Sequence, residues 1–196
     1  MARAVFFDRD GVINREVDYL RRVEDLQVLP GAARAMRTLR EAGFRVIVVT
    51  NQSGVARGLL SRTRLSAIHR ELKRRLARQG ARWDALYYSP HAADSAHPMR
   101  KPGVGMLRLA RVRFGLDLGR SYLIGDTTTD IKTARNAGCA AVLVRTGKAG
   151  RDGKFPDARP DAVRRDAADA ARWILSRERA AREKLQSRKR RPRRKE

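Results

Sequence analysis

The chain has a single cysteine, Cys139, among its 196 residues. A disulfide framework within the chain is therefore excluded, because each bridge needs two cysteines. Cys139 precedes an apolar segment, and we expect it to be buried as a small apolar side chain. Long apolar runs are missing too: no stretch approaches the ~18 apolar residues of a membrane span, and the first residues lack a signal-peptide core. We therefore expect a cytoplasmic protein without a membrane span.

Acidic residues are few relative to basic ones. Asp and Glu total 21 against 45 Lys and Arg, which gives a net charge of +24. Residues 176–196 contain eleven basic and three acidic residues, so both the body and the tail of the chain are basic. A basic body suits an anionic substrate such as a phosphate ester, and a basic tail suits nucleic acid or an acidic membrane. Because most of the basic residues are arginine, GC-rich coding bias is an alternative explanation.

Aromatic residues make up only 6% of the chain. Proteins that bind single-stranded nucleic acid commonly stack bases on aromatic side chains, and the scattered Tyr and Trp residues here suggest no such platform. A nucleic-acid-end phosphatase is therefore the least favoured interpretation. A protein that binds nucleic acid through its basic tail remains an alternative to an enzyme with a small-molecule substrate.

The sequence does contain a regular alternation of short apolar runs and amphipathic stretches. The apolar runs predict strands at 4–7, 45–50, 85–89, 121–126 and 140–146. Helical periodicity predicts helices at 32–42, 62–79, 104–114, 130–136 and 161–175. This alternation is typical of an α/β fold with a doubly wound (Rossmann-like) parallel sheet and helices on both faces.

A chain of this length fits one domain with a tail. We expect the domain to span 1–175 and a basic helical extension to follow over 176–196, disordered beyond Ser187. The segments between the motifs, such as 12–29, are too short for a large cap domain. We expect a monomer.

Chemically active side chains follow four of the predicted strands. Parallel strands bring their carboxyl ends to one edge of the sheet, where ligands bind in this class of fold. The residues concerned are Asp8, Asp10, the segment 50–53, Arg100, Lys101 and Asp126. Each motif alone can be explained as a turn, a helix cap or a solvated loop. Their occurrence together, in order, at successive strand ends predicts an active site.

These residue types predict phosphoryl transfer assisted by Mg²⁺, which prefers oxygen ligands. The carboxylates of Asp8 and Asp126, with a backbone carbonyl nearby, can hold such an ion. Asp8 can also attack phosphorus to give an aspartyl phosphate if Thr50 and Lys101 mask the charge of the phosphate. Asp10 can then protonate the leaving oxygen and later activate water.

The motifs resemble those of the haloacid dehalogenase-like hydrolases: D-x-D-G, a Thr or Ser after the second strand, a downstream Lys, and G-D-x-x-x-D. The resemblance covers about residues 4–147. The segments DRDGVIN, TNQSGVARG, RKPGVGML and VRTGK look more narrowly like the branch that acts on the 7-phosphate of heptose 1,7-bisphosphate and, more distantly, on histidinol phosphate. The resemblance implies a Mg²⁺-dependent phosphatase of small phosphate esters, with a sugar phosphate preferred to histidinol phosphate.

Carried over position by position, the resemblance also implies residue roles. Asp8 would be the nucleophile and Asp10 the proton donor. The phosphoryl group would be stabilised by Thr50, Arg100 and Lys101, and magnesium would be held by Asp8, Asp10 and Asp126. Substrate would be contacted by Glu16, Asp18, Tyr19, Asn51, Gln52, Ser53, Arg100 and Lys101.

Two loops depart from the family pattern. The family often carries a zinc loop of the form C-x-H followed by C-x-C-R-K, whereas this chain has SPH at 89–91 and HPMRK at 97–101. Ser and Met are poor replacements for thiolate ligands, so we expect no structural zinc here. Thr127 follows Asp126 where the heptose-phosphate enzymes often have Lys. The resemblance therefore predicts the reaction more firmly than the substrate.

Overall fold

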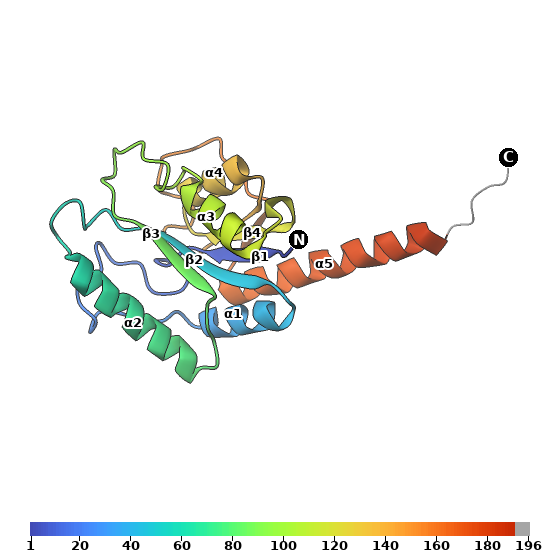
Figure 1. Cartoon of the computed structure of the whole chain (residues 1–196), viewed down its shortest axis with the longest axis horizontal. Helices are drawn as coiled ribbons and strands as arrows, with labels where there is room; N and C mark the ends of the chain where they lie inside the picture. Colours follow the sequence, from blue (N-terminus) through green and yellow to red (C-terminus); the bar gives the residue numbers. More distant parts are fainter. Residues whose placement is uncertain (191–196) are drawn as a thin grey trace.

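The computed structural model describes residues 1–190, which form one six-stranded parallel sheet with helices on both faces (Figure 1). The strands are β1 (Ala4–Phe7), β2 (Arg45–Asn51), β3 (Ala85–Ser89), β4 (Tyr122–Gly125), β5 (Ala140–Val144) and β6 (Ala162–Arg164). Their spatial order is β3-β2-β1-β4-β5-β6. The predicted doubly wound fold is therefore confirmed.

The helices form two layers around the sheet. They are α1 (Ala32–Glu41), α2 (Arg62–Arg78), α3 (Gly105–Phe114), the 3₁₀ helix η1 (Leu118–Arg120), α4 (Thr128–Ala137) and α5 (Ala167–Arg190). α1, α2 and α5 cover one face, and α3 and α4 cover the other (Figure 1). Since side chains alternate along a strand, Val5 and Phe7 pack in the first layer while Ala4 and Phe6 pack in the second. Burial on both faces explains why the strands read as continuous apolar runs.

The prediction of a helix over 161–175 is wrong at its start. Residues 162–164 form β6, which pairs with β5, and α5 begins only at Ala167. The three-residue strand is too short to show an alternating pattern of its own next to an Ala- and Arg-rich helix. The expected disorder beyond Ser187 is also wrong for 188–190, which continue α5. The remainder of that expectation, 191–196, lies outside the described residues.

The first half of α5 packs against the rest of the domain, and its second half projects away from it (Figure 1). Ala170 and Ile174 are fully buried against α1 and the sheet. Glu178 accepts a hydrogen bond from the Tyr122 hydroxyl at 2.8 Å and pairs with Arg3. None of the helices within 1–190 combines the length and the apolar character that crossing a bilayer requires.

The order of the strands places a crevice between the ends of β1 and β4. The chain leaves β1 toward β2 on one side and returns from β3 to β4 on the other side of β1. In doubly wound sheets the ends of two such strands open apart and form the ligand site. The segment 12–29, which follows β1, carries bends and isolated bridges but no helix or strand of its own. It is a flap, and the described residues 1–190 contain no segment that forms a large cap domain.

Candidate functional site

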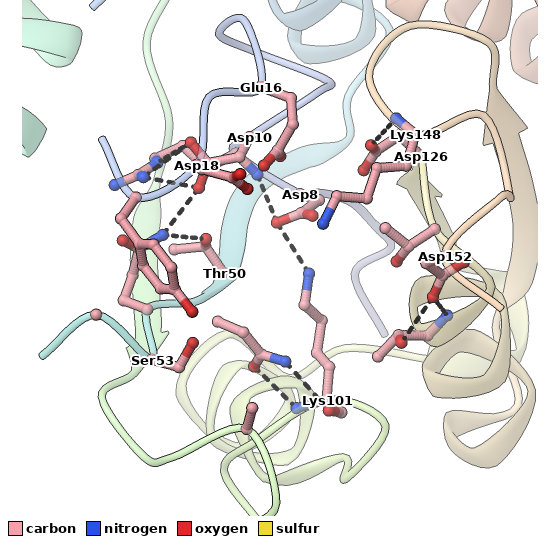
Figure 2. A pocket seen from close by; sticks show the side chains of 18 of the residues that line it. Asp8, Asp10, Glu16, Asp18, Thr50, Ser53, Lys101, Asp126, Lys148 and Asp152 are labelled. Atoms are coloured by element: carbon pink, nitrogen blue, oxygen red, sulfur yellow. Dashed lines mark hydrogen bonds and ion pairs between the residues drawn. The ribbon is translucent and has the colours of Figure 1, made fainter. Parts of the chain in front are cut away.

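A pocket of about 320 Å³ lies at the carboxyl ends of the strands (Figure 2). Every residue that the sequence predicted for the site lines it. They come from the end of β1 and the flap, from the end of β2, from the loop after β3, and from the end of β4. The sequence did not assign a role to several other lining residues, namely Arg9, Arg57, Lys148, Asp152 and Lys154.

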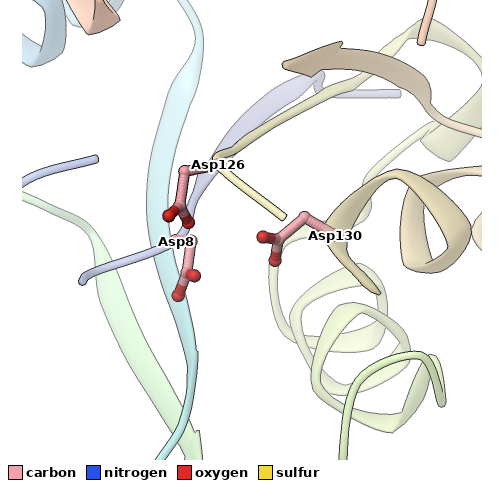
Figure 3. A group of neighbouring side chains, drawn as sticks. All are labelled: Asp8, Asp126 and Asp130. Atoms are coloured by element: carbon pink, nitrogen blue, oxygen red, sulfur yellow. The ribbon is translucent and has the colours of Figure 1, made fainter. Parts of the chain in front are cut away.

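Three carboxylates lie close together at this end of the sheet (Figure 3); Asp8 and Asp126 line the pocket, and Asp130 is buried beside them. Asp8 follows β1, Asp126 follows β4 and Asp130 belongs to α4; each offers an oxygen within 4.8 Å of the others. Burial raises the pKa of Asp8 to about 7, although Lys101 opposes the shift. Burial also raises the pKa of Asp126 to about 8, and the negative charge of Asp130 adds to this. Carboxylates that repel one another in this way favour a divalent cation, and oxygen ligands suit Mg²⁺.

One carboxylate oxygen of Asp126 accepts a hydrogen bond, and the other is in a position to bind a ligand. Its Oδ2 accepts from the backbone N–H of Lys148 at 2.7 Å, whereas Oδ1 is buried without a hydrogen-bond partner among the described residues. Two glycines make room for the group. A Cβ would lie 2.4 Å from Asp126 Oδ2 at Gly11 and 2.2 Å from it at Gly147, and both glycines have a positive φ. An unpaired buried oxygen facing two other carboxylates fits a metal ligand.

Lys101 lies between the nucleophile candidate and α4. Its Nζ is 2.8 Å from Asp8 Oδ1 and 2.6 Å from Asp130 Oδ1, and Figure 2 shows the side chain extended toward Asp8. Burial alone would lower the pKa of Lys101, but the two carboxylates outweigh it and raise the pKa. The amide of Asn51 holds the backbone of Lys101, since it donates to the carbonyl at 3.1 Å and accepts from the N–H at 3.0 Å. Lys101 is therefore a fixed cation beside Asp8.

Asp130 was missed although it stands in the quoted motif G-D-x-x-x-D. It is fully buried at the third position of α4, where its carboxylate accepts from the backbone N–H and the hydroxyl of Thr127. This capping box fixes the start of α4, and the other oxygen of Asp130 binds Lys101. The motif alone indicated the residue, but only the fold shows its two partners.

The carboxylate of Asp10 does not belong to the three-carboxylate group and is bound by other side chains. Arg9 Nη2 donates to both of its oxygens at 2.7 and 2.8 Å, and Asn14 and Gln52 each donate to one at 2.9 Å. Burial would raise the pKa of Asp10, but the charge of Arg9 and these hydrogen bonds together lower it. A metal contact from Asp10 would thus come from its backbone carbonyl. The Gln52 amide also donates to the Thr50 hydroxyl at 2.9 Å, so both side chains are fixed.

The rim of the pocket is rich in cations. Arg57, Arg100, Lys148 and Lys154 line the pocket in addition to buried Lys101. The flap contributes Glu16, Asp18 and Tyr19. Lys148 belongs to the segment VRTGK and had a sequence signal, whereas Lys154 lies in a segment without any motif. The charge of the rim suits an anionic ligand.

The loop 89–101 contains two histidines whose rings stack on each other. The ring centroids of His91 and His97 are 3.6 Å apart, with 18° between the ring planes. Arg100 donates from Nη1 to the carbonyl of His91 at 3.0 Å, which ties this loop to the pocket. The expectation that the loop holds no zinc stays a prediction.

Comparison with known proteins supports a single family. Residues 5–71 match a family model described as haloacid dehalogenase-like hydrolase, and residues 98–170 match one described as HAD-hydrolase-like. The chain is 45% identical over 187 residues to a D-glycero-D-manno-heptose-1,7-bisphosphate 7-phosphatase of Thermosynechococcus vestitus, covering 88% of this chain and 95% of that protein. It is 34% identical over 186 residues to the D-glycero-beta-D-manno-heptose-1,7-bisphosphate 7-phosphatase of Escherichia coli, covering 88% of each.

A solved structure extends this similarity to three dimensions. The D,D-heptose 1,7-bisphosphate phosphatase of B. bronchiseptica, complexed with magnesium and phosphate, superposes with a TM-score of 0.81 at 36% identity. The match covers 89% of this chain and 99% of that one. The similarity in three dimensions therefore extends over most of the chain.

Proposed function

Because this chain belongs to the haloacid dehalogenase-like hydrolases, we propose that it is a Mg²⁺-dependent phosphatase that removes the 7-phosphate of D-glycero-D-manno-heptose 1,7-bisphosphate or of a similar sugar phosphate. The observation that carries the proposal is a buried carboxylate, Asp8, that lies 2.8 Å from the ammonium of Lys101 and within a group of three carboxylates. Relatives aligned over most of the chain carry this enzyme name. Histidinol phosphate is the less favoured substrate.

The reaction we propose has two steps. Asp8 attacks phosphorus and the bond from phosphorus to the sugar oxygen breaks, while Asp10 gives a proton to that oxygen. Asp10 carries this proton in the substrate complex, where the negative charge of the phosphoryl group opposes the lowering of its pKa by Arg9. Asp10 then takes a proton from water, which attacks the aspartyl phosphate and releases inorganic phosphate and free Asp8. Thr50, Arg100 and Lys101 stabilise the charge of the transferring group.

Magnesium would be held by Asp8, Asp126 and the backbone carbonyl of Asp10. When bound, it neutralises phosphate charge and orients the phosphoryl group. The unpaired oxygen of Asp126 and the repulsion within the carboxylate group support this assignment.

The rim residues suit a substrate with two phosphates. Glu16, Asp18, Tyr19, Gln52 and Ser53 would contact the sugar. Cations in excess of the catalytic ones, at Arg57, Lys148 and Lys154, favour a second anionic group. Because the part of the chain that the structure describes places no large cap over the pocket, the substrate itself would fill much of the space.

Catalytic efficiency toward a panel of phosphate esters tests the proposal. Heptose 1,7-bisphosphate should be hydrolysed at the 7-position with a kcat/KM at least about tenfold above that for histidinol phosphate or for 5′- and 3′-phosphorylated oligonucleotides. Phosphate release should require Mg²⁺ and stop in EDTA. Preference for histidinol phosphate or for oligonucleotide ends would reject the sugar-phosphate assignment.

Magnesium should stabilise the fold, and more at high pH. The pKa values of Asp8 and Asp126 are raised in the folded protein, so their charged forms are disfavoured there. The stability of the folded protein therefore falls as pH rises toward about 7 for Asp8 and about 8 for Asp126. Magnesium relieves that repulsion and must displace bound protons at lower pH, so the rise in Tm should be larger at about pH 8 than at about pH 6. Thermal melts with Mg²⁺ or EDTA measure it. Asp126→Asn should reduce the rise, whereas exposed Asp25→Asn should not; equal rises in both would contradict the metal assignment.

Nucleic-acid binding stays a second candidate function, favoured by the projecting end of α5. Residues 179–190 contain six basic residues and one acidic, and Arg179, Arg182 and Lys184 are exposed. Affinity for a DNA oligonucleotide, measured by fluorescence anisotropy, should fall steeply with salt and be lost when 179–196 are deleted. Binding that persists after the deletion would assign it to the body. A monomeric state and a cytoplasmic location stay predictions.

A further inference from the structure

Arg9 is a buried arginine at the pocket to which the proposed reaction assigns no role. Its side chain is 1% exposed. One edge of the guanidinium faces Asp10: Nη2 donates to both carboxylate oxygens at 2.7 and 2.8 Å, and Nε donates to one at 3.1 Å. The remaining nitrogen, Nη1, lies 3.0 Å from Nε2 of His69. Arg9 therefore connects Asp10 to a residue of α2.

The chemistry of arginine fixes the role of His69 in this contact. A guanidinium has only donors, so Nε2 of His69 must be the acceptor, and the ring is neutral with its proton on Nδ1. Burial and the charge of Arg9 lower the pKa of His69 to about 3, which agrees with a neutral ring. The ring also packs edge-on against Tyr88 of β3, with centroids 5.8 Å apart. The imidazole of His69 is thus fixed between the side chain of Arg9 and the ring of Tyr88.

The contact with Arg9 determines how the Asp10 carboxylate is oriented. Asn14 and Gln52 each donate to one of its oxygens, whereas Arg9 donates to both. A planar fork bound to both oxygens fixes the plane of a carboxylate more strictly than a single hydrogen bond does. Rotation of the guanidinium would therefore rotate Asp10, and His69 opposes that rotation from the other side.

We propose that His69 is a positioning residue for the acid–base step: through Arg9, it holds the Asp10 carboxylate in the orientation from which a proton reaches the leaving oxygen. This proposal rests on the proposed phosphatase function. Proton transfer depends steeply on geometry, so a small displacement of Asp10 reduces it while binding of the phosphoryl group is unaffected.

The dependence on the leaving group separates positioning from a merely structural role. A sugar oxygen needs a proton as it leaves, whereas p-nitrophenolate leaves without one. In His69→Leu, kcat with heptose 1,7-bisphosphate should fall about tenfold while kcat with p-nitrophenyl phosphate changes less than about twofold, and KM should stay the same for both. His69→Gln should restore the ratio, because its amide oxygen can accept from Arg9. The matched control is Arg70→Gln, at the next and exposed position of α2.

Two further measurements make the result decisive. In an Asp10→Asn background, His69→Leu should cause no further change in the ratio of the two substrates, since the effect passes through Asp10. Should the Leu variant not fold, His69→Asn replaces it, because its side chain is too short to reach Arg9. Equal losses with both substrates, or a normal ratio in every His69 variant, would overturn the positioning role alone. A wild-type protein that hydrolyses neither substrate would reject the proposed function and the positioning role with it.

Discussion

Asp8→Asn should abolish phosphate release and yet leave the protein at least as stable as the wild type. An amide is not a nucleophile toward phosphorus, so no aspartyl phosphate forms and kcat should fall by about three orders of magnitude or more. Since Asn has nearly the shape of Asp, the pocket should keep its form. A loss of activity without a loss of stability distinguishes a nucleophile from a residue that only supports the fold.

The expected stability follows from the raised pKa of Asp8. Burial raises this pKa to about 7, so the charged carboxylate is disfavoured in the folded state. The folded protein binds more protons than the unfolded chain below that pH, and its stability therefore falls as pH rises toward the raised pKa. Asn carries no charge and removes this cost, while Lys101 keeps its ion pair with Asp130. In EDTA at about pH 8, the Tm of Asp8→Asn should equal or exceed that of the wild type.

Steady-state phosphate release and thermal melts on the same preparations measure both effects. Asp25→Asn makes the same chemical change on the exposed side of the flap and should alter neither. Turnover of Asp8→Asn within about tenfold of the wild type would reject Asp8 as the nucleophile.

Replacing Lys101 with Met should damage both stability and activity. Lys101 is the cation that pairs with buried Asp8 and Asp130, at 2.8 and 2.6 Å. Removing one partner of a buried ion pair leaves an uncompensated charge and typically costs about 3 to 5 kcal/mol. The free energy of unfolding in EDTA should fall by about this amount. Catalysis should fall by about a hundredfold to a thousandfold, because the transferring phosphoryl group loses a fixed cation.

Magnesium should separate the two effects of Lys101→Met. The ion can compensate the negative charge of the carboxylate group, so saturating Mg²⁺ should restore part of the free energy of unfolding but not the lost kcat. Denaturant titrations with and without Mg²⁺ provide the comparison. Lys73→Met, an exposed position on α2, is the matched control. A variant as stable as the wild type in EDTA would mean that Lys101 does not neutralise the buried carboxylates.

The sequence identified most of the sheet because its physical signal is local. β1 was predicted at its observed bounds, since a run of four apolar residues that ends at polar residues is typical of a strand buried on both faces. β6 was missed, because three residues at the edge of the sheet gain their structure from pairing with β5. Its pattern contains no information about that partner.

Asp8 and Asp126 show which properties of the site a sequence motif can predict. Both follow apolar strands, and parallel strands end at one edge, so their convergence was predictable from strand order alone. Their raised pKa values were not predictable, because these depend on burial and on the distance to Asp130. Charge repulsion is a property of the assembled pocket.

The contact between Arg9 and His69 could not be predicted from the sequence. The two residues are 60 positions apart, and His69 lies in a helix whose pattern indicates only which face is buried. By itself, the sequence determined the fold class, the likeness to a phosphatase family and the residues at the strand ends, because each has a local pattern. Only the tertiary structure decided which groups pair with Asp8, Asp10 and Asp126, because hydrogen bonds and buried charges depend on distances that folding sets.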